Sequence, residues 1–190
     1  HARCRLSVFT REEAHAIVDQ HFNDVMAWSQ DAAYIPVWGN HEWDKPASDD
    51  LRNYKGRFDL PNPQTSPGSP AVSCCGEDWT WFDYGNVRFI AYPEPWTSAT
   101  WTDWRTHAET LMDEAQADPA IRFIVTFGHR PAYSSGHHPG EATIRTHLEA
   151  LTAMGAEPVE GSGHRLEAPR GLAPASMSQQ VAFLRRPWPT

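Results

Sequence analysis

The chain has 190 residues, 40% of them hydrophobic, which suffices for one domain with a core and excludes a wholly disordered protein. Its formal net charge of −8 excludes a general basic surface for gripping nucleic acid, and no apolar run approaches membrane-spanning length. We therefore expect neither a nucleic-acid partner nor a membrane span, while the oligomeric state stays open.

The first predicted element is a helix over residues 10–29. Thr10-Arg11-Glu12-Glu13 forms a capping box, in which the Thr hydroxyl and the Glu13 carboxylate satisfy free backbone donors. Apolar side chains then recur on one broad helical stripe. The next segment, Tyr34 to Trp38, is short, apolar and closed by Gly39, a pattern typical of a buried strand.

A long loop follows over residues 45–78, because this stretch is rich in Pro, Gly, Ser and Asn. The later elements are a β-hairpin that turns at Gly85-Asn86, a helix over 102–117, a buried strand over 121–127 and a helix over 141–154. Strands that alternate with helices predict an α/β fold, and ligands in such folds bind outside the carboxyl ends of the strands. We expect residues 1–156 to form this domain and 157–190 to be a weakly ordered, Pro-rich tail.

Polar side chains follow both apolar strands directly after a glycine. Asn40 and His41 come after the first strand, and His129 comes after the second. Neutral imidazoles can hold a metal ion without cancelling its charge, and an amide oxygen is a weak neutral ligand. An unligated histidine beside such an ion can donate protons or stabilise developing charge. A metal ion that activates water for attack on phosphorus would need ligands of these mixed types, which gives a physical reason for these residues at the strand ends.

These motifs resemble those of the calcineurin-like metallophosphoesterases, and most closely their purple acid phosphatase branch. The resemblance rests on Gly39-Asn40-His41-Glu42, on "YGNVRFIAY" at 84–92 and on "GHRPAYSSGHH" at 128–138, and it covers roughly residues 10–155. It implies an incomplete four-layer α/β/β/α sandwich with a binuclear site of divalent or trivalent ions (Fe, Zn or Mn). It also implies hydrolysis of a phosphoric monoester by metal-bound hydroxide, and an extracellular or periplasmic location.

The resemblance also assigns roles to single residues. Asn40 and His129 would bind the same metal, His41 would be the catalytic histidine near the phosphate, and Glu42 would orient His41. His164, in Gly163-His164-Arg165-Leu166, is a further candidate ligand, although an exposed residue of the tail is the favoured alternative for it.

The substrate phosphate would face His138 or its neighbour His137, with Arg130 at the mouth of the site. A solvated loop is an equally good interpretation of the two histidines. No strand before Asn40 ends in the family's Asp-x-His, and no Gly-Asp-x-x-Asp or Gly-Asp-x-x-Tyr motif precedes it. We therefore expect the chain to lack the first metal's ligands and to be inactive alone. The alternative function is a non-catalytic binding or structural module that uses the tryptophan-rich loops at 79–104.

Overall fold

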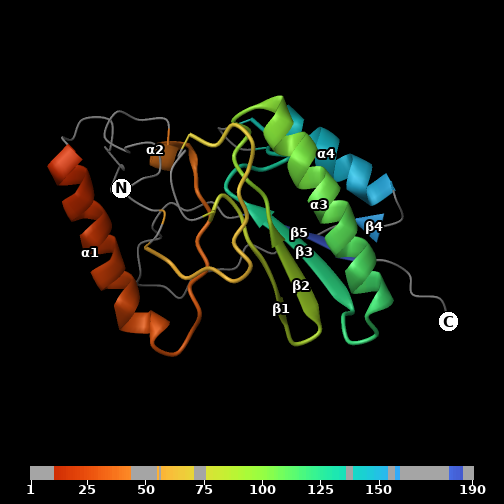
Figure 1. Ribbon diagram of the computed structural model, residues 1–190, viewed down its shortest axis with the longest axis horizontal. Helices are drawn as coiled ribbons and strands as arrows, with labels where there is room; N and C mark the ends of the chain where they lie inside the picture. The colour runs from red at the N-terminus through yellow and green to blue at the C-terminus, as the bar shows by residue number, and fades with distance from the viewer. Residues whose placement is uncertain are drawn as a thin grey trace.

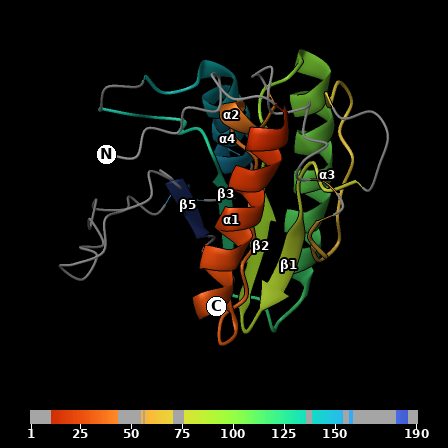
Figure 2. The same ribbon diagram turned by 90° about the vertical axis from the view of Figure 1, so that its left-hand side faces the viewer.

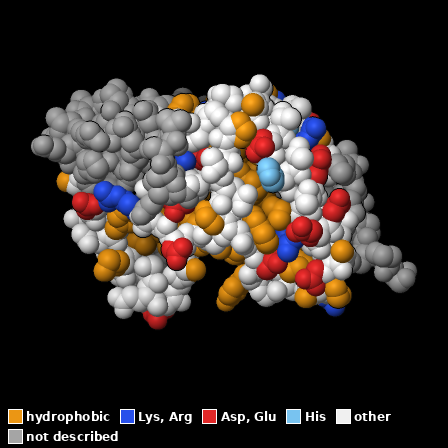
Figure 3. Space-filling view, viewed as in Figure 1, with side chains coloured by type: hydrophobic (Ala, Val, Ile, Leu, Met, Phe, Trp, Pro, Cys, Tyr) orange, Lys and Arg blue, Asp and Glu red, His pale blue; other side chains and the backbone are white. Residues whose placement is uncertain are grey.

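The computed structural model describes residues 11–43, 55, 57–70, 76–135, 139–153, 157–158 and 180–185. Within these residues no helix has the combination of length and apolar character that crossing a bilayer would require. On the face seen in Figure 3, acidic and basic side chains lie among hydrophobic and other side chains.

Nine elements make up the described structure, and the sheet has the strand order β1-β2-β3-β5-β4. In chain order they are α1 (Arg11–Ser29), α2 (Asn40–Trp43), β1 (Trp81–Tyr84), β2 (Val87–Ala91), α3 (Ser98–Ala117), β3 (Phe123–Gly128), α4 (Ala142–Ala153), β4 (Glu157–Pro158) and β5 (Gln180–Arg185). Strands β2 and β3 run parallel, and the other neighbouring strands pair antiparallel. The mixed α/β content and most of the predicted elements are thus confirmed.

Helices α3 and α4 pack together on one side of the sheet, and α1 lies on the other side (Figures 1 and 2). The core lies under α3 and α4, because both helices direct apolar side chains at helical spacing toward β2. Its fully buried members include Ile90, Trp101, Trp104 and Ile144. This packing fixes the strands whose ends carry the predicted site.

Helix α3 begins four residues earlier than predicted. The Thr97 hydroxyl accepts a hydrogen bond from the Thr100 backbone N–H, and the Thr100 side chain accepts one from the Thr97 N–H, so the two residues form a capping box. This start was not predicted from the sequence because a threonine stands in place of the usual Glu or Gln three residues after the cap.

The predicted strand over Tyr34–Trp38 is wrong. These residues lie outside the sheet, and no described strand pairs with them. Pro36 lacks the backbone donor that a ladder needs, which explains part of the failure. Trp38 is nevertheless buried, and its ring lies 5.7 Å from that of Phe58. The segment is therefore held by side-chain contacts, which include a hydrogen bond from Trp38 Nε1 to the Glu77 carbonyl, and not by a strand ladder.

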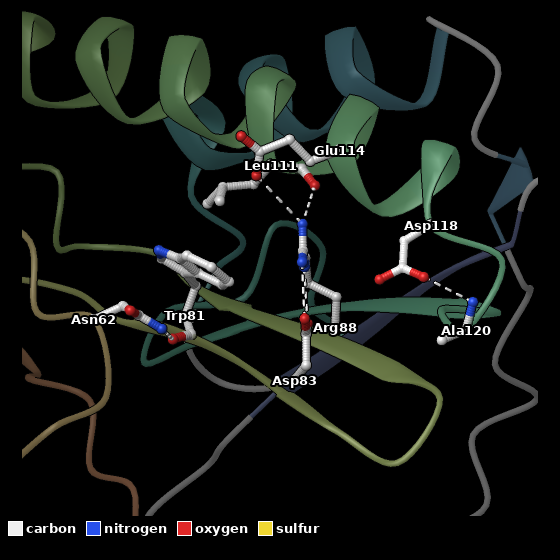
Figure 4. Close-up of polar contacts among 8 residues, drawn as sticks. All are labelled: Asn62, Trp81, Asp83, Arg88, Leu111, Glu114, Asp118 and Ala120. Atoms are coloured by element: carbon white, nitrogen blue, oxygen red, sulfur yellow. Dashed lines mark hydrogen bonds and ion pairs between the residues drawn. The ribbon is translucent and has the colours of Figure 1, made fainter.

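Arg88, a buried cation on β2, links the β1–β2 hairpin to α3 (Figure 4). Its Nε and Nη2 donate to the two oxygens of Asp83 at 2.8 Å, and Nη1 donates to the Leu111 carbonyl at 2.8 Å. The guanidinium also lies 4.9 Å from the Trp81 ring centroid. The hydrogen bonds that Arg88 donates to Asp83 are the main reason that the pKa of Arg88 is raised. Because this cation is fully occupied by structural contacts, we assign it no part in the site.

The sequence predicted no regular element after residue 156, yet β4 and β5 lie in this segment. Strand β5 pairs with β3 from Ile124 to Gly128, so it extends the sheet beside the strand that leads to His129. The boundary proposed between domain and tail stays a prediction.

Candidate functional site

The two motifs meet in space although 89 residues separate them. Asn40 is the first residue of α2, and His129 follows the last residue of β3. The His129 Nε2 lies 3.0 Å from the Asn40 Oδ1, within hydrogen-bond distance. In a neutral ring protonated at Nε2, that N–H donates to the amide oxygen. The predicted convergence of the two motifs therefore appears as a direct contact.

A glycine precedes each motif because a neighbouring ring occupies the place of a side chain. A Cβ built on Gly39 would lie 2.8 Å from three ring atoms of His129. A Cβ on Gly128 would lie 1.9 Å from the Tyr92 ring. Both distances are below those that real Cβ atoms show, so any larger residue forces a shift. Close approach, rather than a left-handed backbone, is the reason for glycine at these two positions.

Glu42 stabilises the turn that presents the first motif. Its carboxylate Oε2 accepts a hydrogen bond from the Gly39 N–H at 2.8 Å, while its own N–H donates to the Gly39 carbonyl at 3.1 Å. This is the acidic half of a capping box at the start of α2. Glu42 therefore fixes the backbone on which Asn40 and His41 stand, whereas the expected orientation of His41 by Glu42 stays a prediction.

The electrostatic surroundings keep His129 neutral. Burial is the main cause that lowers its pKa, and the electrostatic influence of Arg130 and of His41 lowers it further. A neutral imidazole is the form that can bind a metal ion. The Nδ1 atom of His41 is buried and has no hydrogen-bond partner in the described structure. His129 is thus in the protonation state that a metal ligand needs. His41 has a ring nitrogen that no hydrogen bond occupies in the described structure.

A buried carboxylate that the sequence analysis missed lies beside these groups. Glu94 is 2% exposed and follows β2, and its Oε2 accepts from Arg130 Nε at 2.8 Å and from Trp43 Nε1 at 3.3 Å. The Tyr92 hydroxyl donates to the Arg130 carbonyl at 2.8 Å, and burial raises the pKa of this phenol. The available signal was a polar residue just past an apolar strand, in "AYPEPW".

The residues fit part of a metal site. Two ligand atoms of the same metal ion, each about 2.1 Å from it and about 90° apart as seen from the ion, lie about 3 Å from each other. This separation matches the 3.0 Å between Asn40 Oδ1 and His129 Nε2. No group of three or more His, Cys, Asp or Glu side chains with metal-binding geometry exists among the described residues. Asn40 and His129 can hold one ion, but they do not complete its coordination.

Three of the predicted residues cannot be placed. His137, His138 and His164 fall outside the described residues. Tyr133 is 59% exposed, and its hydroxyl donates to Glu149 on α4.

A literal Asp-x-His occurs at Asp19-Gln20-His21, but within α1. Residues two apart in a helix point to nearly opposite sides, so Asp19 and His21 cannot bind one ion together. Asp19 instead pairs with Arg57, and His21 Nε2 lies 3.0 Å from the Tyr34 hydroxyl.

The tryptophans of residues 79–104 mostly build the core. Trp79, Trp101 and Trp104 are at most 3% exposed. The Trp104 Nε1 donates to the Ala91 carbonyl at 2.9 Å, which ties α3 to the end of β2. These three side chains therefore offer no surface on which a ligand could stack.

Comparison with protein families identifies the family of this domain. A family model described as calcineurin-like phosphoesterase (Metallophos) matches residues 10–154, which is most of the chain. No curated protein and no solved structure gives a significant match.

Proposed function

Because the chain belongs to the calcineurin-like phosphoesterase family, a family of metal-dependent phosphoester hydrolases, we propose that it contributes to hydrolysis of a phosphoric monoester of the purple acid phosphatase type. The proposal includes the second sheet of a four-layer sandwich, packed on the side of the sheet away from α3 and α4. It also includes a site in which Asn40 and His129 bind one of two metal ions.

The contact between Asn40 and His129 is the observation that carries this proposal. Two segments 89 residues apart bring an amide oxygen and an imidazole nitrogen to 3.0 Å. Burial keeps the imidazole in its neutral form, which a ligand requires. A bound divalent ion supplies Lewis acidity that activates water and withdraws charge from the phosphoryl oxygens.

The chain's own residues supply the remaining parts that we assign. His41 stands next to Asn40 on α2, and its buried Nδ1 has no hydrogen-bond partner among the described residues. As the family resemblance implies, we assign this side chain proton donation or charge stabilisation at the phosphoryl group. Arg130 supplies a positive charge beside His129 for binding the substrate's phosphate. His137, His138 and His164 stay candidate residues for the phosphate and the metal.

Hydrolysis of p-nitrophenyl phosphate tests the proposal. The 190-residue chain and a version extended upstream in its own reading frame should be assayed with added zinc, manganese or iron, each beside its His41→Ala variant and a control, His107→Ala, on the exposed side of α3. We expect metal-dependent turnover only in the extended chain, lost in His41→Ala and kept in His107→Ala. A general acid contributes only about 10²–10⁴-fold, whereas the slowest phosphate-ester reactions need up to ~10²¹-fold.

The opposite results are equally specific. No turnover by the extended chain with any of the three metals would contradict the hydrolase assignment. Turnover that survives His41→Ala would remove His41 from the mechanism. Metal-dependent turnover by the 190 residues alone would show that these residues complete the metal centre by themselves.

A further inference from the structure

Glu94 joins three segments of the site. It follows β2, and its Oε2 accepts hydrogen bonds both from Trp43, in the helix that carries Asn40 and His41, and from Arg130, in the turn that carries His129. With an exposed fraction of 2%, this carboxylate is almost fully withdrawn from water. An ionised group in such a place is costly unless it is paired and hydrogen-bonded. The hydrogen bonds from Trp43 and Arg130 therefore hold the Glu94 carboxylate in place, and the carboxylate in turn holds these two side chains.

The contact with Glu94 engages only one of the donor atoms of the Arg130 guanidinium. Its side chain is 33% exposed, and only Nε is engaged with Glu94. The Nη groups have no partner among the residues that the structure describes. A guanidinium is planar and carries five donors in a rigid fork, so a bond at Nε fixes the plane in which the remaining donors point. Arg130 thus has an orientation set by Glu94 and free donors at a partly open position.

We propose that Glu94 is a positioning residue that orients Arg130 so that its Nη donors bind the oxygens of a phosphate group. The proposal rests on the function proposed above and adds the residue that sets the geometry of phosphate recognition. Bidentate hydrogen bonds from a guanidinium to phosphate depend on the direction of the fork, which a flexible arginine loses. A purely structural Glu94 would tie the two turns together without affecting the affinity for phosphate through Arg130.

Binding of inorganic phosphate to the 190-residue chain without added metal separates these roles. The dissociation constant should be measured by NMR titration for the wild type, Glu94→Gln, Arg130→Gln and the double variant, with Arg122→Gln as a control that removes one exposed positive charge. Loss of one charge-assisted hydrogen bond weakens binding on the order of tenfold. We expect this loss in each single variant at Glu94 and Arg130, and no further loss in the double variant.

The results distinguish the inference from the proposed function. Unchanged affinity in Glu94→Gln, or additive losses in the double variant, would overturn the role of Glu94 acting through Arg130. A wild type that binds phosphate no better than Arg130→Gln would also overturn it, while the hydrolase assignment is decided separately by turnover. If Glu94→Gln reduces the folded fraction seen by near-UV circular dichroism, Arg130→Lys serves instead. Lysine keeps the charge but not the fork, so unchanged affinity there would contradict the proposal.

Discussion

Replacement of Gly39 by alanine should uncouple the two motifs. The new Cβ would lie 2.8 Å from three His129 ring atoms, whereas ordinary contact begins at 3.4 Å, so the ring must retreat by about 0.6 Å. A retreat of this size stretches the 3.0 Å contact between His129 Nε2 and Asn40 Oδ1 past hydrogen-bond distance. Overpacking costs roughly 1–3 kcal/mol and the lost hydrogen bond about 1 kcal/mol. We expect Gly39→Ala to lower the free energy of unfolding by about 2–4 kcal/mol.

A double-mutant cycle in urea tests this cause. In a His129→Ala background the ring is absent, so Gly39→Ala should cost less than about 1 kcal/mol. Gly85→Ala is the matched control, because Gly85 has φ of 61° and no atom within 4 Å of a built Cβ. Its cost of roughly 1–2 kcal/mol comes from backbone strain and should be equal in both backgrounds. An equal cost of Gly39→Ala with and without the His129 ring would refute the close-approach argument.

Three further predictions follow from the site. Calorimetric titration with zinc or manganese should show at most one weakly bound ion on the 190-residue chain, because Asn40 and His129 are neutral ligands; two tight, stoichiometric ions would reveal carboxylate ligands that we have not identified. The pKa of His129 is below its model-compound value of 6.5, so its neutral ring contributes stability that is complete above pH 6.5 and is lost as the pH falls toward the lowered pKa. Urea unfolding from about pH 7.5 to about pH 5 should therefore show a smaller pH dependence in His129→Gln, with a residual part from His147, whose pKa is also lowered; an unchanged slope would contradict this. Gly128→Ala should destabilise the chain by roughly 1–3 kcal/mol, because its Cβ would overlap the Tyr92 ring, and a truncating Tyr92→Ala background should relieve most of that loss.

Local signals in the sequence predicted most of the fold. Helices α1, α3 and α4, strand β3 and the hairpin at Gly85-Asn86 each have caps, periodicity or turn residues within a short window. Gly85 adopts a positive φ, as a two-residue hairpin turn requires. Elements specified by neighbouring residues are those that a single sequence reveals best.

Features that depend on tertiary contacts were not predicted. The Tyr34–Trp38 segment is apolar enough for a strand, but a strand also needs a partner, and the aromatic packing of Trp38 on Phe58 holds it instead. Glu94 reaches its partners Arg130 and Trp43 across 36 and 51 residues, a relation that no local pattern encodes. The contact of Asn40 with His129 was predictable because the two motifs carry the same order of glycine and polar residue, and because the family resemblance assigns both residues to one metal.

The carboxylates nearest Asn40 and His129 are already engaged in hydrogen bonds, so we do not expect them to serve as metal ligands. Glu42 uses an oxygen to cap the turn at Gly39, and Glu94 uses one to hold Arg130 and Trp43. Moving either onto a metal ion would release the turn or the arginine that it fixes. We therefore expect a hard cation bound by Asn40 and His129 to need an acidic ligand other than Glu42 and Glu94. A carboxylate ligand adds negative charge, whereas the amide of Asn40 and the neutral imidazole of His129 add none. Adding such a carboxylate should therefore strengthen metal binding more than any substitution of Asn40 or His129.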